Sequence, residues 1–402
     1  MADKKPTLLI AKGIISRMGG AERDLLRNLP HLTKWYDVSV ATLSSCDELE
    51  EICHNNDIKL FKPEKPWIPN YSLTSQIFDK IHTSSKESWL SCRDLIESID
   101  TFDYFHIISG DGYLSILEIL PPTKKSHLYL LEPHRGFHED SLHRNLNGKL
   151  RRPKFITNFL LSKGRKNDKK IVRKFSQQSN TAISGNSSYT AQRINEVYGI
   201  KCGFIHPCVD RAEYTDDTEQ FSNPYLQADE GAYVVTIGTA NWAKGSMETI
   251  SMLSGTNISL VHVGGGNDNQ IKTLQEHASN NNVKLWVAPR LSSPQLSILM
   301  KESLAIVSMA HKEPFGLTPI EAFSIGTPAI FVDDGGFRDS IIDGECGRLL
   351  PRYDYEKWHE ALNQCKDAKI RESWAIAGRN RILQLKLSPL EQAQKIHQLL
   401  QD

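Results

Sequence analysis

The chain of 402 residues lacks the features that mark several specialised classes of protein. No apolar run approaches the roughly 18 residues that a helix needs to span a bilayer. The seven cysteines are scattered and show no C-x-x-C spacing, so we expect free thiols in a reducing compartment, without a zinc site or a disulfide framework. The 48 basic and 48 acidic side chains cancel, so the chain as a whole indicates no charged partner.

We also expect no secretory signal in the amino-terminal stretch of this sequence. Lys12 interrupts the short apolar run in MADKKPTLLIAKGII, and no small-residue cleavage site follows it. We therefore expect a cytoplasmic protein. Its content of 39% hydrophobic and 24% charged residues is that of a globular protein, and its length suits two domains of about 200 residues each.

Short apolar runs alternate with helical patterns along the whole chain. TLLIAK (Thr7–Lys12) and YFHIIS (Tyr104–Ser109) are such runs in the first half, and YVVTIG (Tyr233–Gly238) is one in the second. This alternation predicts two α/β domains, each with a parallel sheet covered by helices on both faces. The acidic and poorly periodic segment Pro207–Gly231 indicates the linker between them.

The most informative stretch is HKEPFGLTPIEAFSIGTPAI, which follows an expected strand and runs from His311 to Ile330. Within it we expect a short helix with Thr318 as N-cap and Glu321 completing a capping box three residues later. Gly326 is expected to end that helix. Its loop would lie at the carboxyl end of a parallel strand, where open α/β sheets bind ligands.

The start of this helix is a candidate anion site. The N–H groups of Gly316, Leu317 and Thr318 would point out of the helix toward a phosphate. Glu313 and Glu321 flank the stretch, and carboxylates accept strong hydrogen bonds from hydroxyl groups. A nucleotide-sugar carries hydroxyls on both sides of its diphosphate and fits this pattern. The simpler alternatives are a capping role for Glu321 and a helix-dipole role for Glu313.

One segment breaks the neutral charge balance. Arg144–Lys174 contains twelve basic residues, opposed only by Asp168, and it encloses the apolar insert Phe155–Ser162. A basic segment with an apolar insert indicates contact with an anionic membrane surface. The alternative is a solvated pair of basic helices. We expect no nucleic-acid partner, because no aromatic-rich binding module lies beside the segment.

The stretch EPFGLTPIEAFSIGTPAI resembles the E-x7-E signature of the family 4 retaining glycosyltransferases, which adopt the GT-B fold. GGAER, HPCVD, KGSMETI, LVHVGGG and DDGGFRDSIIDGECGRLL resemble further elements of that family in the same order. The resemblance implies two Rossmann-like domains facing a cleft. The acceptor domain would span 1–206 and the donor domain 207–385, and a final helix, 386–402, would cross back onto the first domain.

The resemblance also implies roles for individual residues. Glu313 would bind hydroxyls of the transferred sugar, and Lys244 would pair with the diphosphate and stabilise the charge that develops as the glycosidic bond breaks. Glu321 would bind the ribose, and Leu291 would lie beside the base. The full set of expected donor-binding residues is Glu321, Phe315, Gly316, Leu317, Leu291, Arg290 and Gly20. The donor would be a UDP- or GDP-sugar, with no cofactor and no metal.

Two positions depart from the family pattern. Relatives usually carry an arginine where this chain has Thr239, and we expect Arg290 or Arg338 to replace that cation. Relatives often place a histidine where this chain has Leu131. The residues Glu132, His134 and Arg135 follow it and are expected on the acceptor side.

The expected function is transfer of a hexose-type sugar, with retention of anomeric configuration, to a hydroxyl of a glycan or of a lipid-linked acceptor. Retention would follow from front-face attack, with the leaving diphosphate taking the acceptor proton. Peripheral attachment to a membrane through Arg144–Lys174 is expected with it. Two alternatives stay open: a nucleotide-sugar epimerase of GT-B fold, and a catalytically weak nucleotide-sugar-binding subunit, which the missing arginine at Thr239 would support.

Overall fold

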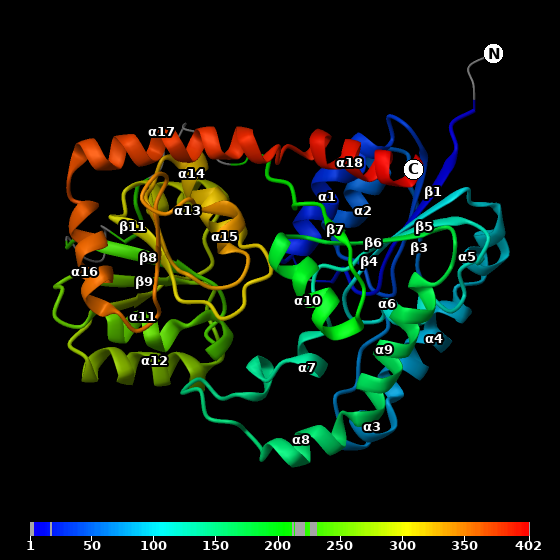
Figure 1. Ribbon diagram of the computed structural model, residues 1–402, viewed down its shortest axis with the longest axis horizontal. Helices are drawn as coiled ribbons and strands as arrows, with labels where there is room; N and C mark the ends of the chain where they lie inside the picture. The colour runs from blue at the N-terminus through cyan, green and yellow to red at the C-terminus, as the bar shows by residue number, and fades with distance from the viewer. Residues whose placement is uncertain (1–3, 17, 211–212, 214–221, 226–230, 402) are drawn as a thin grey trace. The chain divides into compact units, whose positions relative to one another are not determined.

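The computed structural model describes residues 4–16, 18–210, 213, 222–225 and 231–401. Contacts divide the chain into two compact units, and each is described here by itself (Figure 1). Unit 1 comprises Met1–Asp140, Arg152–Cys208 and Ser388–Asp402, and unit 2 comprises Ser141–Arg151 and Val209–Leu387. Much of the expected linker, Pro207–Gly231, lies outside the described residues.

One segment differs from the expected domain boundaries. Ser141–Arg151 lies within the stretch 1–206 that we expected to form the first domain, but its contacts group it with unit 2. Leu146 packs against the apolar core of unit 2, and the Arg144 guanidinium lies 4.8 Å from the centre of the Trp242 ring. The segment is too short and too polar to carry a periodic signal, so its sequence could not indicate where it packs.

Unit 1 is built on a seven-stranded parallel sheet with the order β3-β2-β1-β4-β5-β6-β7. The inner strand β1 is fully buried at Leu8, Leu9 and Ile10, because helices cover both faces of the sheet. The strands are β1 (Thr7–Lys12), β2 (Asp37–Ala41), β3 (Lys59–Phe61), β4 (Tyr104–Ile108), β5 (Lys125–Tyr129), β6 (Thr181–Gly185) and β7 (Gly203–Phe204).

The helices of unit 1 form two layers. Figure 1 shows α1, α2 and α18 on one face of the sheet and α4, α6 and α9 on the other. The bounds are α1 (Gly20–Leu32), α2 (Asp47–Asn55), α3 (Leu73–Phe78), α4 (Lys80–Ser91), α5 (Arg93–Ser98), α6 (Tyr113–Ile116), α7 (Arg135–His138), α8 (Lys154–Leu160), α9 (Ser162–Ser176), α10 (Ser188–Tyr198) and α18 (Pro389–Gln401).

The last helix, α18, packs on α1 within unit 1. The Gln392 side-chain amide donates to the side-chain oxygens of Asp24 at 2.8 and 3.0 Å, and the Asn28 amide donates to the Gln392 oxygen at 2.7 Å. Ile396 and Leu400 join the apolar cluster on this face of the sheet. The polar contacts are buried, so they fix the register of the two helices.

Unit 2 is built on a six-stranded parallel sheet with the order β10-β9-β8-β11-β12-β13. Figure 1 shows α11 and α12 on one face and α13, α14 and α17 on the other. The strands are β8 (Tyr233–Ile237), β9 (Ser259–Val263), β10 (Leu285–Val287), β11 (Ala305–Ser308), β12 (Ala329–Val332) and β13 (Arg348–Leu350). The helices are α11 (Ser246–Leu253), α12 (Asp268–Asn280), α13 (Ser293–Lys301), α14 (Leu317–Ile325), α15 (Phe337–Ser340), α16 (Tyr355–Gln364) and α17 (Ala368–Leu385). The two parallel α/β sheets predicted from the alternating pattern are confirmed.

A buried histidine pair joins two strands of the sheet of unit 1. The Nδ1 atoms of His106 on β4 and His127 on β5 lie 2.9 Å apart, and His127 Nε2 lies 2.8 Å from the Ser184 hydroxyl. Burial lowers the pKa of His106 to about 3, and burial together with the neighbouring His106 lowers the pKa of His127. Both rings are therefore neutral at pH 7, whereas an unfolded chain protonates its histidines near pH 6.5.

This pair predicts a loss of stability in acid. Below about pH 6.5 these two histidines bind protons in the unfolded chain but stay neutral in the folded chain, so the free energy of unfolding falls as the pH falls. In the His106→Gln variant one such group is absent. We expect the stability advantage of the unsubstituted protein over this variant to shrink by up to about 2 kcal/mol between pH 6 and pH 4.5.

Urea unfolding at both pH values measures this difference. The exposed His54→Gln variant is the matched control and should keep a constant difference from the unsubstituted protein. A difference for His106→Gln that does not change with pH would contradict the assignment of a neutral, buried His106.

Candidate active site

The candidate site in unit 2 centres on the loop between β11 and α14. The expected N-cap at Thr318 is wrong: α14 begins at Leu317, its N-cap is Gly316, and no side chain caps it. Gly316 has φ 83° and ψ 90°, a conformation open to glycine, and this turn starts the helix before Thr318 is reached. Glu321 therefore lies in the second turn and forms no capping box. The helix ends at Gly326 with φ 76°, as predicted.

Close packing against a second loop fixes the conformation of Gly316. A Cβ atom on Gly316 would lie 2.4 Å from the buried ring of Phe337. Next to it, the Gly336 N–H donates to the Glu313 carbonyl at 2.7 Å, and Cβ atoms on Gly335 and Gly336 would collide with the backbone of Glu313 and Pro314. The glycine pair after β12 thus holds the backbone that carries Glu313.

Lys244 and Glu313 form an ion pair at the carboxyl ends of β8 and β11. Lys244 Nζ lies 2.9 and 3.2 Å from the two carboxylate oxygens of Glu313, and both side chains are partly buried. The Asn241 side chain caps the short 3-10 helix Trp242–Lys244 by accepting from the Lys244 N–H. Gly245 then packs so closely that a Cβ atom would lie 2.0 Å from the Met309 carbonyl oxygen.

The other unit 2 residues that we expected to bind the donor occupy different environments. Phe315 is buried in the core of unit 2, so its backbone and not its ring faces the loop. Arg290 is exposed, and Leu291 is partly buried against the core, in the loop between β10 and α13. Glu321 is partly buried on α14. The structure therefore brings Lys244, Glu313, Gly316 and Leu317 together around the start of α14.

Thr239, which stands where relatives usually carry an arginine, takes part in the local hydrogen bonding. The hydroxyl of Thr239 accepts a hydrogen bond from the Asn241 amide at 2.8 Å and so supports the cap before Lys244. Arg338, expected as a replacement cation, pairs with the Asp333 carboxylate at 2.6 Å. Arg352, which we did not foresee, donates to the Met309 and Ala310 carbonyls and to Asp334, and it thus anchors the loop after β11.

A second polar cluster lies at the carboxyl ends of β1, β4 and β5 in unit 1. Lys12 is almost fully buried, and its Nζ lies 3.1 Å from a carboxylate oxygen of Glu22 on α1. The expected donor residue Gly20 is the first residue of α1 in unit 1, two residues before Glu22. A Cβ atom on Gly13 would lie 1.8 Å from the Asp111 carbonyl oxygen, so the loops after β1 and β4 touch.

His134 completes the cluster through Asp111. The His134 Nε2 lies 3.6 Å from an Asp111 oxygen, and the Tyr71 hydroxyl donates to the other oxygen at 2.6 Å. Burial acts to lower the pKa of His134, but the hydrogen bond to Asp111 and its charge outweigh burial and raise that pKa above its usual value. Asp111 carried no sequence signal, because only the contact with His134 reveals it.

The expected acceptor residues Glu132 and Arg135 pair with each other. Arg135 Nη2 lies 2.9 Å from a Glu132 carboxylate oxygen, and its Nε donates to the same oxygen at 3.1 Å.

Among the described residues no group of three or more histidine, cysteine, aspartate and glutamate side chains is placed to hold a metal ion. None of the described helices is both long and apolar enough to cross a bilayer.

Comparison with known families identifies the part of the chain that contains the Lys244–Glu313 pair and the loop after β11. Residues 217–381 match the family described as glycosyl transferases group 1. This part of the chain belongs to the group 1 glycosyltransferases. The match includes Lys244, the E-x7-E stretch and the glycine pair Gly335–Gly336, so the loops of the glycosyltransferase segment are those described above.

Similar proteins include two D-inositol 3-phosphate glycosyltransferases. The one from Rhodococcus erythropolis is 26% identical over 205 residues, which cover 47% of this chain and 46% of the relative. The one from Jonesia denitrificans is 26% identical over 223 residues, which cover 50% of this chain and 53% of the relative. The chain thus spans about half the length of the curated relatives that it matches.

Solved structures resemble the whole chain in fold. A glycosyltransferase from Rickettsia africae has a TM-score of 0.68 at 15% identity, covering 99% of this chain and 98% of its own. Anabaena HepE in complex with UDP-glucose has a TM-score of 0.67 at 14% identity, covering 98% and 99%. WaaG, a glycosyltransferase involved in lipopolysaccharide biosynthesis, has a TM-score of 0.67 at 15% identity and the same coverage. The predicted GT-B fold is confirmed.

The glycine at the start of α14 predicts a measurable steric effect. In Gly316→Ala the new methyl group would strike the Phe337 ring, whereas Gly344→Ala, at a similar φ of 78°, places it in open space. Both variants strain the backbone, but only the first must displace a buried ring. We expect Gly316→Ala to lower the free energy of unfolding by about 1–3 kcal/mol more than Gly344→Ala.

Chemical denaturation of both variants measures this difference. Equal losses of stability in the two variants would mean that Phe337 moves aside freely and that the loop is not held as described.

Proposed function

We propose that this chain is a retaining glycosyltransferase that moves a hexose-type sugar from a UDP- or GDP-sugar to a hydroxyl acceptor. The Lys244–Glu313 pair at the start of α14 is the observation that carries the proposal. It places one cation and one carboxylate beside a helix start whose first N–H groups have no partners within the helix. A sugar diphosphate needs these three kinds of group.

The donor would bind along this loop. The N–H groups at the start of α14 and the Lys244 ammonium would neutralise the diphosphate, and Glu313 would accept hydrogen bonds from hydroxyls of the transferred sugar. Glu321 would bind the ribose, and Leu291 would lie beside the base. The HepE complex with UDP-glucose, which shares the fold, supports a donor of this class.

Lys244 would also assist the chemical step. As the bond between the sugar and the diphosphate breaks, negative charge grows on the leaving phosphate, and a fixed cation lowers the energy of that state. In the described structure the Lys244 ammonium forms an ion pair with the Glu313 carboxylate. A bound diphosphate would compete with Glu313 for Lys244 and free the carboxylate for the sugar. This exchange needs no metal or other cofactor.

The acceptor would bind to unit 1. Asp111 orients the His134 ring and raises its pKa, so this pair can hold or release a proton near an acceptor hydroxyl. The related D-inositol 3-phosphate glycosyltransferases are named for an acceptor that is itself a polyol. We propose a glycan or a lipid-linked sugar as the acceptor here.

Substitution of the ion pair tests the proposed chemistry. We expect Lys244→Ala and Glu313→Ala each to cut the rate of sugar transfer at least tenfold, because each removes at least about 1.4 kcal/mol of transition-state stabilisation. A thermal-shift screen of nucleotide-diphospho-sugars first finds the donor, since a ligand that binds the folded state raises the melting temperature. Proton NMR of the product then reports the anomeric configuration.

Lys357→Ala is the matched control, because Lys357 pairs with Asp354 on the surface of the same unit. Full transfer by Lys244→Ala, or inversion at the anomeric carbon, would contradict the proposal. Turnover of the donor without any acceptor would favour an epimerase, and tight donor binding without transfer in the unsubstituted protein would favour a binding subunit.

We further propose that unit 1 attaches to an anionic membrane. The basic stretch Arg144–Lys174 is divided: its first part lies in unit 2, and its remainder forms α8 and α9 of unit 1. On α8, Phe155 is 74% exposed and Phe159 is 70% exposed. The neighbouring helix α3 adds Leu73 and Phe78, which are also exposed.

Basic side chains border these apolar residues. Arg152 and Lys154 are exposed at the start of α8, and Lys163 Nζ donates to the Phe78 carbonyl at 3.0 Å. Two contributions drive peripheral membrane binding: aromatic rings enter the boundary of the acyl chains, and basic side chains attract anionic headgroups. A lipid-linked acceptor would then be reached from the same surface.

The double variant Phe155→Glu/Phe159→Glu tests this attachment. We expect at least a tenfold loss of partitioning onto vesicles that contain anionic phospholipid, because two rings no longer leave water. Ile376→Glu/Leu383→Glu on α17 is the matched control, since these residues are 49% and 62% exposed in unit 2. Vesicle flotation measures both, and equal binding by the two double variants would refute the assignment.

A further inference from the structure

The segment Ser141–Arg151 forms a hairpin on unit 2 that no part of the donor site uses. Arg144 and Leu150 pair in an antiparallel bridge, the Gly148 N–H donates to the Asn145 carbonyl at 3.0 Å, and the Arg144 guanidinium donates to the Gly148 carbonyl at 2.6 Å. Gly148 has φ 77°, and a Cβ atom there would lie 2.7 Å from Trp242 Nε1. The hairpin is therefore shaped to fit against Trp242.

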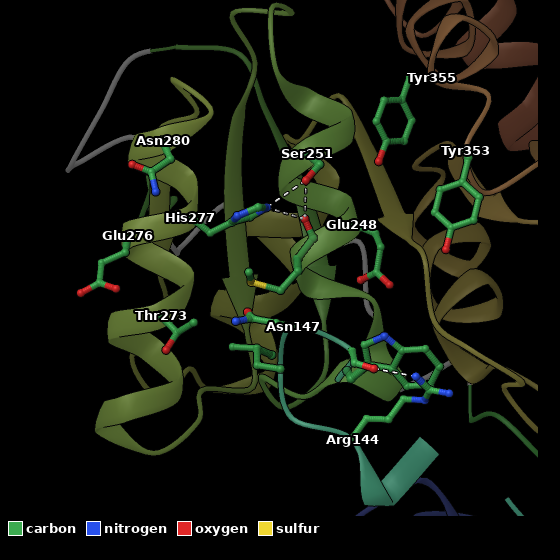
Figure 2. Close-up of a pocket in the computed structure, with 14 residues that line it drawn as sticks. Arg144, Asn147, Glu248, Ser251, Thr273, Glu276, His277, Asn280, Tyr353 and Tyr355 are labelled. Atoms are coloured by element: carbon green, nitrogen blue, oxygen red, sulfur yellow. Dashed lines mark hydrogen bonds between the residues drawn. The ribbon is translucent and has the colours of Figure 1, made fainter. Parts of the chain in front are cut away.

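A pocket of about 650 Å³ lies between this hairpin, α11, α12 and the turn that contains Tyr353. Its volume is within the range of roughly 300–1,000 Å³ that is usual for ligand-binding clefts. Figure 2 shows Tyr353, Tyr355 and Arg144 on one side, the α12 residue Thr273 on the other, and Asn147 between them. All of these residues belong to unit 2.

The lining combines one free aromatic face with many hydrogen-bonding groups. Tyr353 is 75% exposed, so its ring is available for stacking. Carboxylates, amides and hydroxyls surround it, and only two aliphatic or thioether side chains take part. The lining residues are Arg144, Leu146, Asn147, Gly148, Trp242, Met247, Glu248, Ser251, Thr273, Glu276, His277, Asn280, Tyr353 and Tyr355.

This composition selects among ligand classes. The pocket has two carboxylates, Glu248 and Glu276, and a single arginine. The Arg144 guanidinium already donates to the Gly148 carbonyl and lies over the Trp242 ring. The net negative lining therefore disfavours a phosphate or a nucleotide. A lipid chain would leave most of the polar lining without partners. A saccharide, whose rings have an apolar face and whose edges carry hydroxyls, matches an exposed tyrosine ring surrounded by carboxylates and amides.

One wall of the pocket has an unused acceptor. Glu248 Oε1 lies 2.8 Å from His311 Nε2, whereas Glu248 Oε2 is enclosed and has no hydrogen-bond partner among the described residues. An enclosed acceptor without a donor costs free energy, and a small turn of this carboxylate toward the pocket would let a ligand hydroxyl supply one.

The pocket is also connected to the donor loop. The Trp242 ring stacks on His311 with 3.8 Å between the ring centres, and His311 stands two residues before Glu313. Trp242 in turn stands two residues before Lys244. A ligand that orders the hairpin against Trp242 would therefore act on the segments that carry both members of the ion pair.

We propose that this pocket is a saccharide-binding site, separate from the donor site, and that it takes an uncharged oligosaccharide. Tyr353 stacks on a sugar ring, and Asn147 of the hairpin, with Glu248 and Thr273, contacts hydroxyls. The occupant is a glycan segment and not the sugar that is transferred. The proposal does not depend on the proposed activity, because binding is measured without turnover.

Saturation-transfer-difference NMR of the full chain tests the site. The probes are maltotriose, cellotriose, mannotriose and lactose, each at millimolar concentration, with UDP and GDP present to fill the donor site. We expect at least one probe to bind, and we expect Tyr353→Ala and Asn147→Ala each to weaken that binding at least tenfold. Both residues are exposed, so these variants should fold normally.

Two control variants separate the pocket from general effects. Tyr353→Phe keeps the stacking ring and should bind within about threefold of the unsubstituted protein, and Asn269→Ala, exposed on α12 but outside the pocket, should bind equally well. Binding of none of the probes, or binding that Tyr353→Ala leaves unchanged, would overturn the proposal. Retained thermal shifts with a nucleotide-sugar in the same variants would show that the donor site is unaffected by either result.

Discussion

The loop after β11 is held by contacts so close that only glycine fits. Gly245 meets the Met309 carbonyl from one side, and Gly335 and Gly336 meet the backbone of Glu313 and Pro314 from the other. Gly316 then turns against Phe337 and starts α14. The contacts of Gly245, Gly335 and Gly336 join backbone to backbone, so the backbone of Glu313 depends little on flexible side chains for its position. Lys244, one residue before Gly245, is placed by the same packing.

Parallel sheets explain why polar side chains gather where they do. The carboxyl ends of neighbouring parallel strands meet at one edge, so loops that are distant in sequence become neighbours there. In unit 2 this edge unites Lys244 after β8 with Glu313 after β11. In unit 1 the same rule unites Lys12 at the end of β1, Asp111 after β4 and His134 after β5. The proposed donor and acceptor chemistry thus uses one topological principle twice.

The hairpin Ser141–Arg151 shows how a short insertion can add a binding surface to such a fold. It supplies Arg144, Asn147 and Gly148 to a pocket whose other walls are α11, α12 and the turn that contains Tyr353. Because Trp242 contacts Arg144 of the hairpin and also stacks on His311 in the loop after β11, the hairpin also supports the segment that carries Lys244. The segment that follows it in the chain, α8, bears the exposed rings of the proposed membrane surface. Two proposed binding surfaces therefore arise from one continuous stretch of chain.

Hydrophobic periodicity and the glycine, proline and carboxylate pattern after β11 were enough to predict two parallel α/β units and the loop of the candidate site. Those signals are local, since the alternation of buried and exposed positions and the turn residues lie within a few residues of one another. Tertiary packing alone decided that Gly316 and not Thr318 caps α14, since Phe337 contacts it from another loop. It also decided the pairing of His134 with Asp111 and the docking of Ser141–Arg151 on unit 2. Each of these depends on residues far apart in the chain, and no local pattern records which distant partner a side chain will meet.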